Sequence, residues 1–314
     1  MKRKNGLFGK DILSVDQFSK KDLSLLFKKA VTMKKIVESR KNSKILQGKI
    51  MAALFYEPSS RTFGSFISAM QRLGGEVIPL QGMAYSSVAK GETLEDTIRT
   101  FECYSDIIVI RHPEVGSARR AALAAKTPII NAGDGVGEHP TQALLDLFTI
   151  LSKFKKIDGL KVAFVGDLLN GRTVHSLSKL LAKMGRVEFF FVSPKILRIP
   201  QEIKNQLKNR VKIKEIDKLG DIINEVNVLY VTRIQRERFS DLSIYEKIKN
   251  LYIINKKLIG KAKKNLILMH PLPRVGEINI DVDSDPRAVY LTEQMRNGLY
   301  VRMALLAAIL GKTK

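Results

Sequence analysis

One stretch of the chain, residues 50–66 (IMAALFYEPSSRTFGSF), joins an apolar run directly to the start of a helix. Residues 50–56 are almost continuously apolar, as in a short parallel strand that is buried on both faces. Glu57 and Pro58 interrupt the run, a small-residue helix follows, and a second strand completes the unit at residues 76–80. A strand–helix–strand unit of this kind predicts an α/β fold with a parallel sheet.

The four residues at the end of the first strand bring anion-binding groups together. They are Ser59, Ser60, Arg61 and Thr62. Three hydroxyls and one guanidinium beside the N–H groups of a helix N-terminus are well suited to binding phosphate. The glycine–lysine pattern of a Walker loop is absent. An ordinary helix cap followed by a surface arginine explains the same residues, so the other strand ends must discriminate between the two interpretations.

The alternation of strand and helix continues to the end of the chain. Strands are expected at residues 50–56, 76–80, 106–110, 128–131, 160–165, 187–192, 211–215, 228–232 and 266–269, and helices at 20–39, 62–73, 94–104, 116–125, 141–154, 172–185 and 291–310. The composition turns charged at residues 153–159, where a second series begins. We therefore predict two domains, each a mostly parallel sheet flanked by helices: residues 1–150, completed by the C-terminal helix at 291–314, and residues 151–290.

The net charge of +23, from 54 Lys and Arg against 31 Asp and Glu, would by itself suggest a nucleic-acid partner. The lysines are scattered along helical segments without interleaved aromatic residues, so nucleic acid is not the expected partner. A positive field would also attract a small anionic substrate. The single cysteine, Cys103, forms no internal disulfide, and the basic N-terminus (MKRKNGLFGKDILS) has no apolar stretch long enough for a signal peptide or a membrane span. A cytoplasmic location is expected.

Polar side chains follow several of the predicted strands. They are Arg111, His139, Gln142, Arg172, Arg233 and Gln235, with a rigid Pro-Leu-Pro turn at residues 271–273 and a polar loop that carries Ser86 and Lys90. Taken singly, such a histidine is often a cap and such a lysine is often only solvated. Parallel sheets bind ligands beyond the carboxyl ends of their strands, so we expect one cleft between the domains. Without paired carboxylates, a Cys/His cluster or a G-x-G-x-x-G motif, neither a metal nor a cofactor is expected, and the groups suit polyanions.

Seven segments, in order, resemble the catalytic chains of the aspartate carbamoyltransferases, over a match that runs from about Phe18 to the end. They are EPSSRTFGSF, SSVAKGETLEDT, RHPEVG, GEHPTQALLDLFTI, GDLLNGRTVHSL, TRIQRERF and HPLPRVGEI. The related ornithine enzymes share the first segment but typically carry a cysteine in the turn occupied here by HPLPR. The resemblance implies transfer of a carbamoyl group from carbamoyl phosphate to L-aspartate, in pyrimidine biosynthesis.

The resemblance also implies a role for each site residue. The phosphate would be held by Ser59, Ser60, Arg61 and Thr62. Arg111 would bridge the phosphate and the carbonyl oxygen, His139 and Thr62 would bind that oxygen, and Gln142 would hold the carbamoyl amide. Arg172 and Arg233 would bind the two carboxylates of aspartate with help from Gln235. The backbone carbonyls of Leu272 and Pro273 would orient the reacting nitrogen groups.

In this family the residues at Ser86 and Lys90 act in the neighbouring subunit's site, which implies a homotrimer with shared active sites. Regulatory chains or a dihydroorotase are further partners that the resemblance leaves open. Glu57 and Arg238 match positions that brace the closed domains, although a surface ion pair explains them as well.

Four residues depart from the family pattern, and two other functions remain to be weighed. Ser60 stands where threonine is usual, Phe63 replaces a common arginine, Ile67 a common acid, and Gly276 a position that is often polar. The change at residue 63 removes a positive charge beside the phosphate site. A carbamoyltransferase for another amino acid, such as ornithine, is opposed by Arg233, Gln235 and the HPLPR turn. A catalytically silent assembly subunit, or a nucleic-acid binder, is opposed by the retention of every expected polar site residue.

Overall fold

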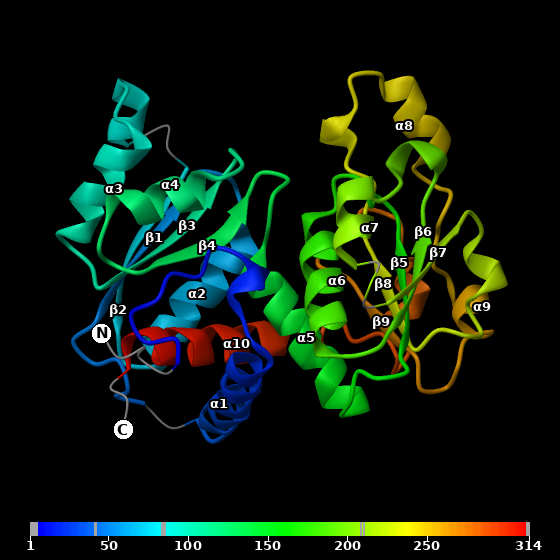
Figure 1. Ribbon diagram of the computed structural model, residues 1–314, viewed down its shortest axis with the longest axis horizontal. Coiled ribbons are helices and arrows are strands. Elements are labelled where there is room, and N and C mark those ends of the chain that lie inside the picture. Colours follow the sequence, from blue (N-terminus) through cyan, green and yellow to red (C-terminus); the bar gives the residue numbers. More distant parts are fainter. Residues whose placement is uncertain (1–5, 41–42, 83–85, 208, 210, 312–314) are drawn as a thin grey trace. The chain divides into compact units, whose positions relative to one another are not determined.

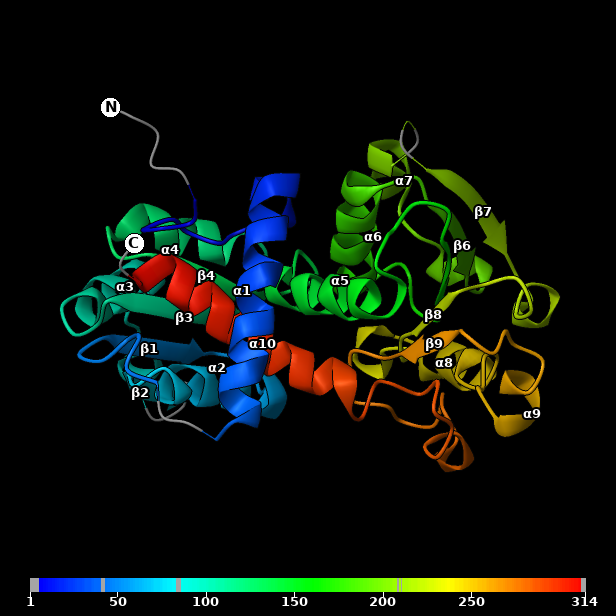
Figure 2. The same cartoon turned by 90° about the horizontal axis from the view of Figure 1, so that it is seen from below.

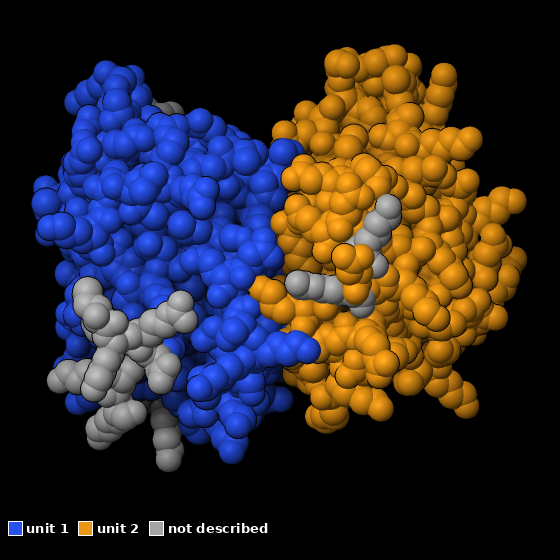
Figure 3. Space-filling view, viewed as in Figure 1, with its two compact units in different colours: residues 1–148, 296–314 blue, residues 149–295 orange. Residues whose placement is uncertain are grey.

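The computed structural model describes residues 6–40, 43–82, 86–207, 209 and 211–311. Contacts within the chain divide it into two compact units, residues 1–148 with 296–314 and residues 149–295, which Figure 3 colours separately. The division falls inside two helices, α5 (Pro140–Phe154) and α10 (Glu293–Leu310). Across the described residues, no helix is long and apolar enough to span a membrane.

Unit 1 is built on a sheet of four parallel strands in the order β2-β1-β3-β4. The strands are β1 (Ile50–Phe55), β2 (Glu76–Gln81), β3 (Ile107–His112) and β4 (Ile129–Asp134). The three strands after the edge strand β2 are almost entirely buried, which explains why their sequences are apolar runs and not alternating patterns.

Helices cover both faces of this sheet. They are α1 (Lys20–Glu38), α2 (Ser60–Arg72), α3 (Leu94–Glu102) and α4 (Ser117–Ala124), together with parts of α5 and α10. Apolar side chains of α3 and α4 pack on Ala52, Leu54, Ile108 and Ile110. The helices α1 and α10 lie on the opposite side, where Figure 2 shows them crossing in front of the strands. A capping box between Ser19 and Asp22 begins α1, as its sequence predicts.

Unit 2 contains five parallel strands in the order β7-β6-β5-β8-β9 (Figure 1). They are β5 (Lys161–Val165), β6 (Glu188–Val192), β7 (Lys212–Ile216), β8 (Val228–Val231) and β9 (Ile267–Met269). The α-helices of this unit are α6 (Arg172–Met184), α7 (Gln201–Leu207), α8 (Leu242–Ile248) and α9 (Lys256–Ile259). One sheet face carries an aromatic cluster of Phe164, Phe189, Phe191 and Tyr230, whose ring centroids lie 5.6 to 5.8 Å apart.

Short 3-10 helices occupy several of the connections. They are η1 (Val15–Gln17), η3 (Ser87–Lys90), η4 (Lys195–Leu197), η5 (Leu219–Asp221), η6 (Arg236–Arg238) and η7 (Ile280–Val282). All nine predicted strands and the seven predicted helices are confirmed, and the prediction of parallel sheets flanked by helices is correct. Two details were wrong. The strand expected at residues 128–131 continues to Asp134 as β4, and the short helices α7, α8 and α9 were not predicted.

Candidate functional site

Both sheets reverse their winding direction at a central pair of strands. In unit 1 the central pair is β1 and β3: the chain moves outward from β1 to β2 on one side and from β3 to β4 on the other. In unit 2 the corresponding pair is β5 and β8. Ligands of open α/β sheets bind beyond the carboxyl ends of such a pair. The predicted site residues of each unit follow these central strands or their neighbours.

The predicted phosphate-binding residues form the first turn of α2, directly after β1. Ser59 is the N-cap residue, and among the described residues its side chain caps no backbone N–H of the helix. Ser60 and Arg61 are exposed, whereas Thr62 is buried. An ordinary N-cap serine accepts a hydrogen bond from the second or third residue of its helix. Since Ser59 does not, its hydroxyl and the helix N-terminus remain suited to an anion.

Arg111 lies near the end of β3, the strand that pairs with β1 in parallel. Its guanidinium donates to the carbonyl oxygen of Ala132 at 3.3 Å and lies 3.3 Å from a carboxylate oxygen of Glu57. The Arg111 side chain is only 13% exposed. Glu57 precedes the phosphate-binding turn, so the ion pair fixes the guanidinium beside that turn.

His139 and Gln142 flank the start of α5, after the loop that follows β4. Both are buried, and the His139 carbonyl accepts the backbone N–H of Gln142 at 3.0 Å. The Gln142 amide donates to Asp146 one turn later at 3.0 Å. Burial lowers the pKa of Arg302 in α10 to about 10, while the attraction of Asp146 opposes this shift. The buried carboxylate of Asp146, which also attracts Arg302, thus orients the Gln142 side chain.

The loop before His139 is held by the buried carboxylate of Asp134. This carboxylate accepts hydrogen bonds from the backbone N–H of Glu138 at 2.8 Å and of Gly116 at 3.0 Å, and from the side-chain amide of Asn131 at 3.1 Å. The loop that leads to His139 is therefore tied to the segment that follows Arg111. Unit 1 brings Ser59–Thr62, Arg111, His139 and Gln142 to three adjacent strands, β1, β3 and β4.

The Ser86 and Lys90 segment forms a short turn of its own. Ser86 caps η3 by accepting the N–H of Val88 at 3.3 Å, and Lys90 ends η3 with an exposed side chain. Residues 83–85 of this predicted loop lie outside the described residues. The side chain of Lys90 therefore lies at the surface of unit 1.

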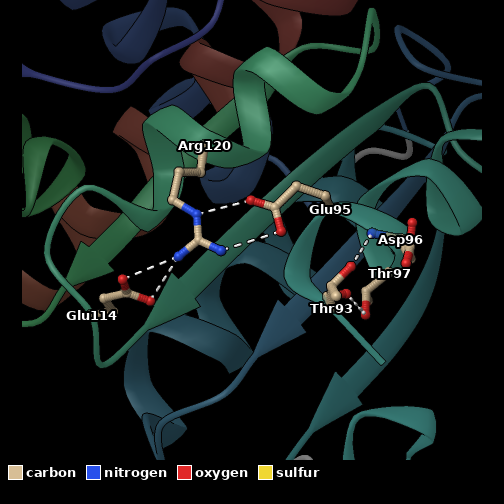
Figure 4. A network of polar contacts seen from close by, with 6 residues as sticks. All are labelled: Thr93, Glu95, Asp96, Thr97, Glu114 and Arg120. Atoms are coloured by element: carbon tan, nitrogen blue, oxygen red, sulfur yellow. Dashed lines mark hydrogen bonds and ion pairs between the residues drawn. The ribbon is translucent and has the colours of Figure 1, made fainter. Parts of the chain in front are cut away.

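One arginine links the helix after Lys90 to the segment after Arg111 (Figure 4). Arg120 of α4 donates to both carboxylate oxygens of Glu95 in α3, at 2.8 and 3.2 Å, and to both oxygens of Glu114, at 2.9 and 3.0 Å. Hydrogen bonding to Glu95 is the main reason that the pKa of Arg120 is raised. Sequence reasoning missed this network, because its residues lie on three separate elements.

The second group of site residues begins with the loop between β5 and α6, which packs against the end of β8. A Cβ atom at Gly166 would lie 2.1 Å from the carbonyl oxygen of Thr232, so only glycine permits this approach. The buried Asp167 accepts the backbone N–H of Asn170 at 2.9 Å. Arg172 then begins α6. Arg172 therefore begins the helix that follows β5, and β5 is the neighbour of β8 in the sheet.

Gln235 and Arg233 follow β8. The Gln235 amide donates to the carbonyl oxygen of Asn170 at 3.2 Å, which connects it to the Arg172 loop. Arg233 forms a bidentate ion pair with Glu237, with one N–O distance of 2.9 Å. The hydrogen bonds between them raise the pKa of Arg233 and lower that of Glu237. Sequence reasoning missed Glu237, although its spacing of four residues from Arg233 was visible.

The turn after β9 carries Leu272 and Pro273. Leu272 has a left-handed backbone with φ +58°, and its peptide bond to Pro273 is cis. Gly276 has φ +109°, and nothing lies within 4 Å of where its Cβ would be. The glycine at this departure from the family pattern is thus explained by backbone conformation and not by space. Among the described residues, no three His, Cys, Asp or Glu side chains lie close enough together to hold a metal ion.

Phe63 fills a packing position at the phosphate-binding turn. Its ring meets that of Phe55 in β1 edge to face, with centroids 5.1 Å apart. The aromatic side chain therefore joins α2 to the end of β1. Ser60 keeps the hydroxyl of the usual threonine, and nothing in the structure explains Ile67.

We expect Phe63→Ala to lower the free energy of unfolding by about 1–2 kcal/mol, because the partly buried ring loses its contact with Phe55. Urea denaturation would show a lower midpoint at an unchanged slope. The matched variant Phe63→Leu should recover about half of the loss. Equal stability of Phe63→Ala and the unaltered chain would contradict the packing role.

Comparison with known proteins identifies the family. Residues 10–152 match the model of the aspartate/ornithine carbamoyltransferase carbamoyl-P binding domain, and residues 158–309 match that of the Asp/Orn binding domain. The chain belongs to the aspartate/ornithine carbamoyltransferase family. It is 54% identical, over 303 residues, to the chloroplastic aspartate carbamoyltransferase of Arabidopsis thaliana, covering 96% of this chain and 77% of that protein.

Two further members of this carbamoyltransferase family extend the comparison. Aspartate transcarbamoylase from Trypanosoma cruzi, in a crystal structure with carbamoyl phosphate and aspartate, has a TM-score of 0.93 and 44% identity, covering 97% of this chain and 98% of that one. The multifunctional protein pyr1-3 of Dictyostelium discoideum is 53% identical over 308 residues. The match covers 98% of this chain but only 14% of that protein.

Proposed function

We propose that the protein is an aspartate carbamoyltransferase, which forms N-carbamoyl-L-aspartate and phosphate from carbamoyl phosphate and L-aspartate. The observation that carries the proposal is the pair of arginines Arg172 and Arg233. Arg172 begins α6, the helix that follows β5, and Arg233 follows β8, the strand beside β5. Two carboxylates require two cations, and a guanidinium binds a carboxylate through two parallel hydrogen bonds. Ornithine has an ammonium group in place of the second carboxylate and would be repelled.

In unit 1 the anion-binding turn of α2 holds the phosphate of carbamoyl phosphate. Arg111 reaches both the phosphate and the carbonyl oxygen, while His139 and Thr62 donate to that oxygen. Gln142, oriented by Asp146 at 3.0 Å, holds the carbamoyl amide. Glu57 and the carbonyl oxygen of Ala132 fix the Arg111 guanidinium before reaction, which is the condition under which a donor stabilises a developing negative charge most strongly.

The chemistry needs no covalent enzyme intermediate. The neutral amine of aspartate attacks the carbonyl carbon, a C–N bond forms, and the electron pair of the carbonyl moves onto its oxygen. Collapse of this tetrahedral intermediate breaks the carbon–oxygen bond to phosphate. The leaving phosphate accepts the proton that the amine loses. Arg111, His139 and Thr62 act on the oxyanion, and Arg172, Arg233 and Gln235 hold the nucleophile in place.

A substrate assay tests the proposed function. The purified chain is mixed with carbamoyl phosphate and either aspartate or ornithine, and phosphate release and the ureido product are measured. We expect product with aspartate only, because charge-assisted bonds of roughly 1.5–3 kcal/mol each favour the second carboxylate. Product with ornithine alone would assign the protein to the sister activity, and no product with either would favour a silent assembly subunit.

We further propose a homotrimer in which Ser86 and Lys90 complete the site of a neighbouring subunit. The exposed position of Lys90 at the end of η3 supports this proposal. A place in pyrimidine biosynthesis follows from the product. We also propose a cytoplasmic location and association with regulatory chains or a dihydroorotase. The multifunctional relative supports only the idea that such chains are found within larger proteins.

A further inference from the structure

A buried histidine and glutamate organise the turn that follows β9. The ring nitrogen Nδ1 of His270 lies 2.7 Å from the backbone nitrogen of Leu272, and Nε2 lies 2.6 Å from Oε1 of Glu277. The second carboxylate oxygen of Glu277 accepts the N–H of Val275 at 2.8 Å. Both side chains are almost fully buried. These three hydrogen bonds thus link both ends of the turn at residues 270–277 to its backbone.

The partners determine the proton positions on the ring. A backbone N–H only donates, so Nδ1 of His270 must accept and cannot carry a proton. Nε2 therefore carries the proton and donates it to Glu277, which is ionised. Burial of Glu277 opposes ionisation, but the hydrogen bond from His270 and the Val275 N–H outweigh it, and the pKa of Glu277 is lowered. Protonation of Nδ1 would place two donors face to face.

We propose that His270 and Glu277 are a positioning pair, which holds the backbone carbonyls of Leu272 and Pro273 in the orientation that the substrate nitrogens require. The inference rests on the proposed function. Leu272 has φ +58°, which a branched side chain seldom adopts, and the His270 ring binds the N–H of that same residue. Both side chains are almost fully buried, so their action is through the turn.

Other groups around the pair keep it in place. Gln294 accepts the backbone N–H of His270 at 3.0 Å, and the Tyr290 ring lies 6.5 Å from the imidazole. Beyond it, Arg274 donates to Asp283 at 2.6 Å and to the Tyr290 hydroxyl at 3.0 Å. The attraction of Glu277 also reaches Arg233 and contributes to its raised pKa, after its hydrogen bond with Glu237. Of these charged groups, Glu277 is the one that contacts the imidazole directly, through its hydrogen bond with Nε2.

Two substitutions of His270 separate the two hydrogen bonds. In His270→Asn the amide oxygen takes the place of Nδ1 and accepts the N–H two residues on, as in an Asx turn. In His270→Gln the longer side chain reaches Glu277 but leaves the N–H of Leu272 without its acceptor. We expect His270→Gln to lose about 10- to 100-fold in kcat with aspartate, and His270→Asn, which gives up only the bond to Glu277, to lose less. Equal loss in both variants would overturn the proposal.

Glu277 offers a second matched pair. Glu277→Asp keeps two carboxylate oxygens, whereas Glu277→Gln cannot accept from His270 and from Val275 at once. We expect the aspartate variant to retain much more kcat than the glutamine variant. Inhibition by inorganic phosphate should be unchanged in every folded variant, since the phosphate-binding residues belong to unit 1. Ile280→Ala, at a side chain that is 78% exposed, is the control.

The proton positions are measured without any substrate. The chain has only four histidines, so the ring nitrogens of His270 can be assigned by 15N NMR of the single variants. We expect a neutral ring protonated at Nε2 at neutral pH. A proton at Nδ1, or on both nitrogens, would overturn the pair even if the variants failed to fold. Absence of N-carbamoyl-aspartate from the unaltered chain would instead contradict the proposed function.

Discussion

Trimers mixed from two inactive chains should recover activity. The first chain carries Lys90→Ala and the second carries Arg111→Ala. If each site combines Arg111 of one subunit with Lys90 of its neighbour, a site is intact when the Lys90→Ala chain provides the arginine and the Arg111→Ala chain provides the lysine. Random mixing in equal amounts makes about one quarter of the sites intact, because two independent halves must both be correct.

The measurement compares the mixed preparation with each variant alone. The chains are denatured together, refolded and assayed for phosphate release with carbamoyl phosphate and aspartate. The matched control is a chain with both substitutions, mixed in equal amounts with the unaltered chain. This mixture contains the same total number of substitutions. If sites are shared, about a quarter of them are formed by two unaltered chains. If the two single variants stay inactive after mixing while the control regains activity, sites are not shared between subunits.

Loss of either carboxylate-binding arginine should abolish efficient use of aspartate. We expect Arg172→Ala and Arg233→Ala each to lower kcat/KM for aspartate by about 100-fold, since each guanidinium supplies a charge-assisted bidentate contact. Arg172→Lys and Arg233→Lys keep the charge but not the fork, and should fall between. Initial rates at varied aspartate and saturating carbamoyl phosphate measure the effect.

A control variant separates the bidentate contact of Arg233 from the general effect of its positive charge on kcat/KM. Its removal leaves Glu237 without the hydrogen bonds that lower the pKa of that carboxyl group. Arg236→Ala is the control. Arg236 is exposed in η6, three residues after Arg233, and its loss removes one positive charge but leaves the Arg233 guanidinium in place. If Arg236→Ala reduced kcat/KM as much as Arg233→Ala, net charge and not the bidentate contact would account for the loss.

The strands were predictable because each is encoded locally. A buried parallel strand must be apolar on both faces, so β3 and β8 stand out as runs that end at polar residues. The helix α1 was predictable from its spacing and its capping box. Helices α8 and α9 were not, because seven and four residues with at most one buried side chain leave no periodic pattern.

The sequence by itself determined the fold class, the succession of strands along the chain and the choice of candidate site residues, since apolar runs and the polar residues after them are local properties. Only the tertiary structure decided which groups those residues meet. The contacts of Arg233 with Glu237 and of His270 with Glu277 depend on backbone turns, such as the one that Gly276 permits with φ +109°. Hydrogen bonds across a turn require angles and distances that residue spacing alone does not specify.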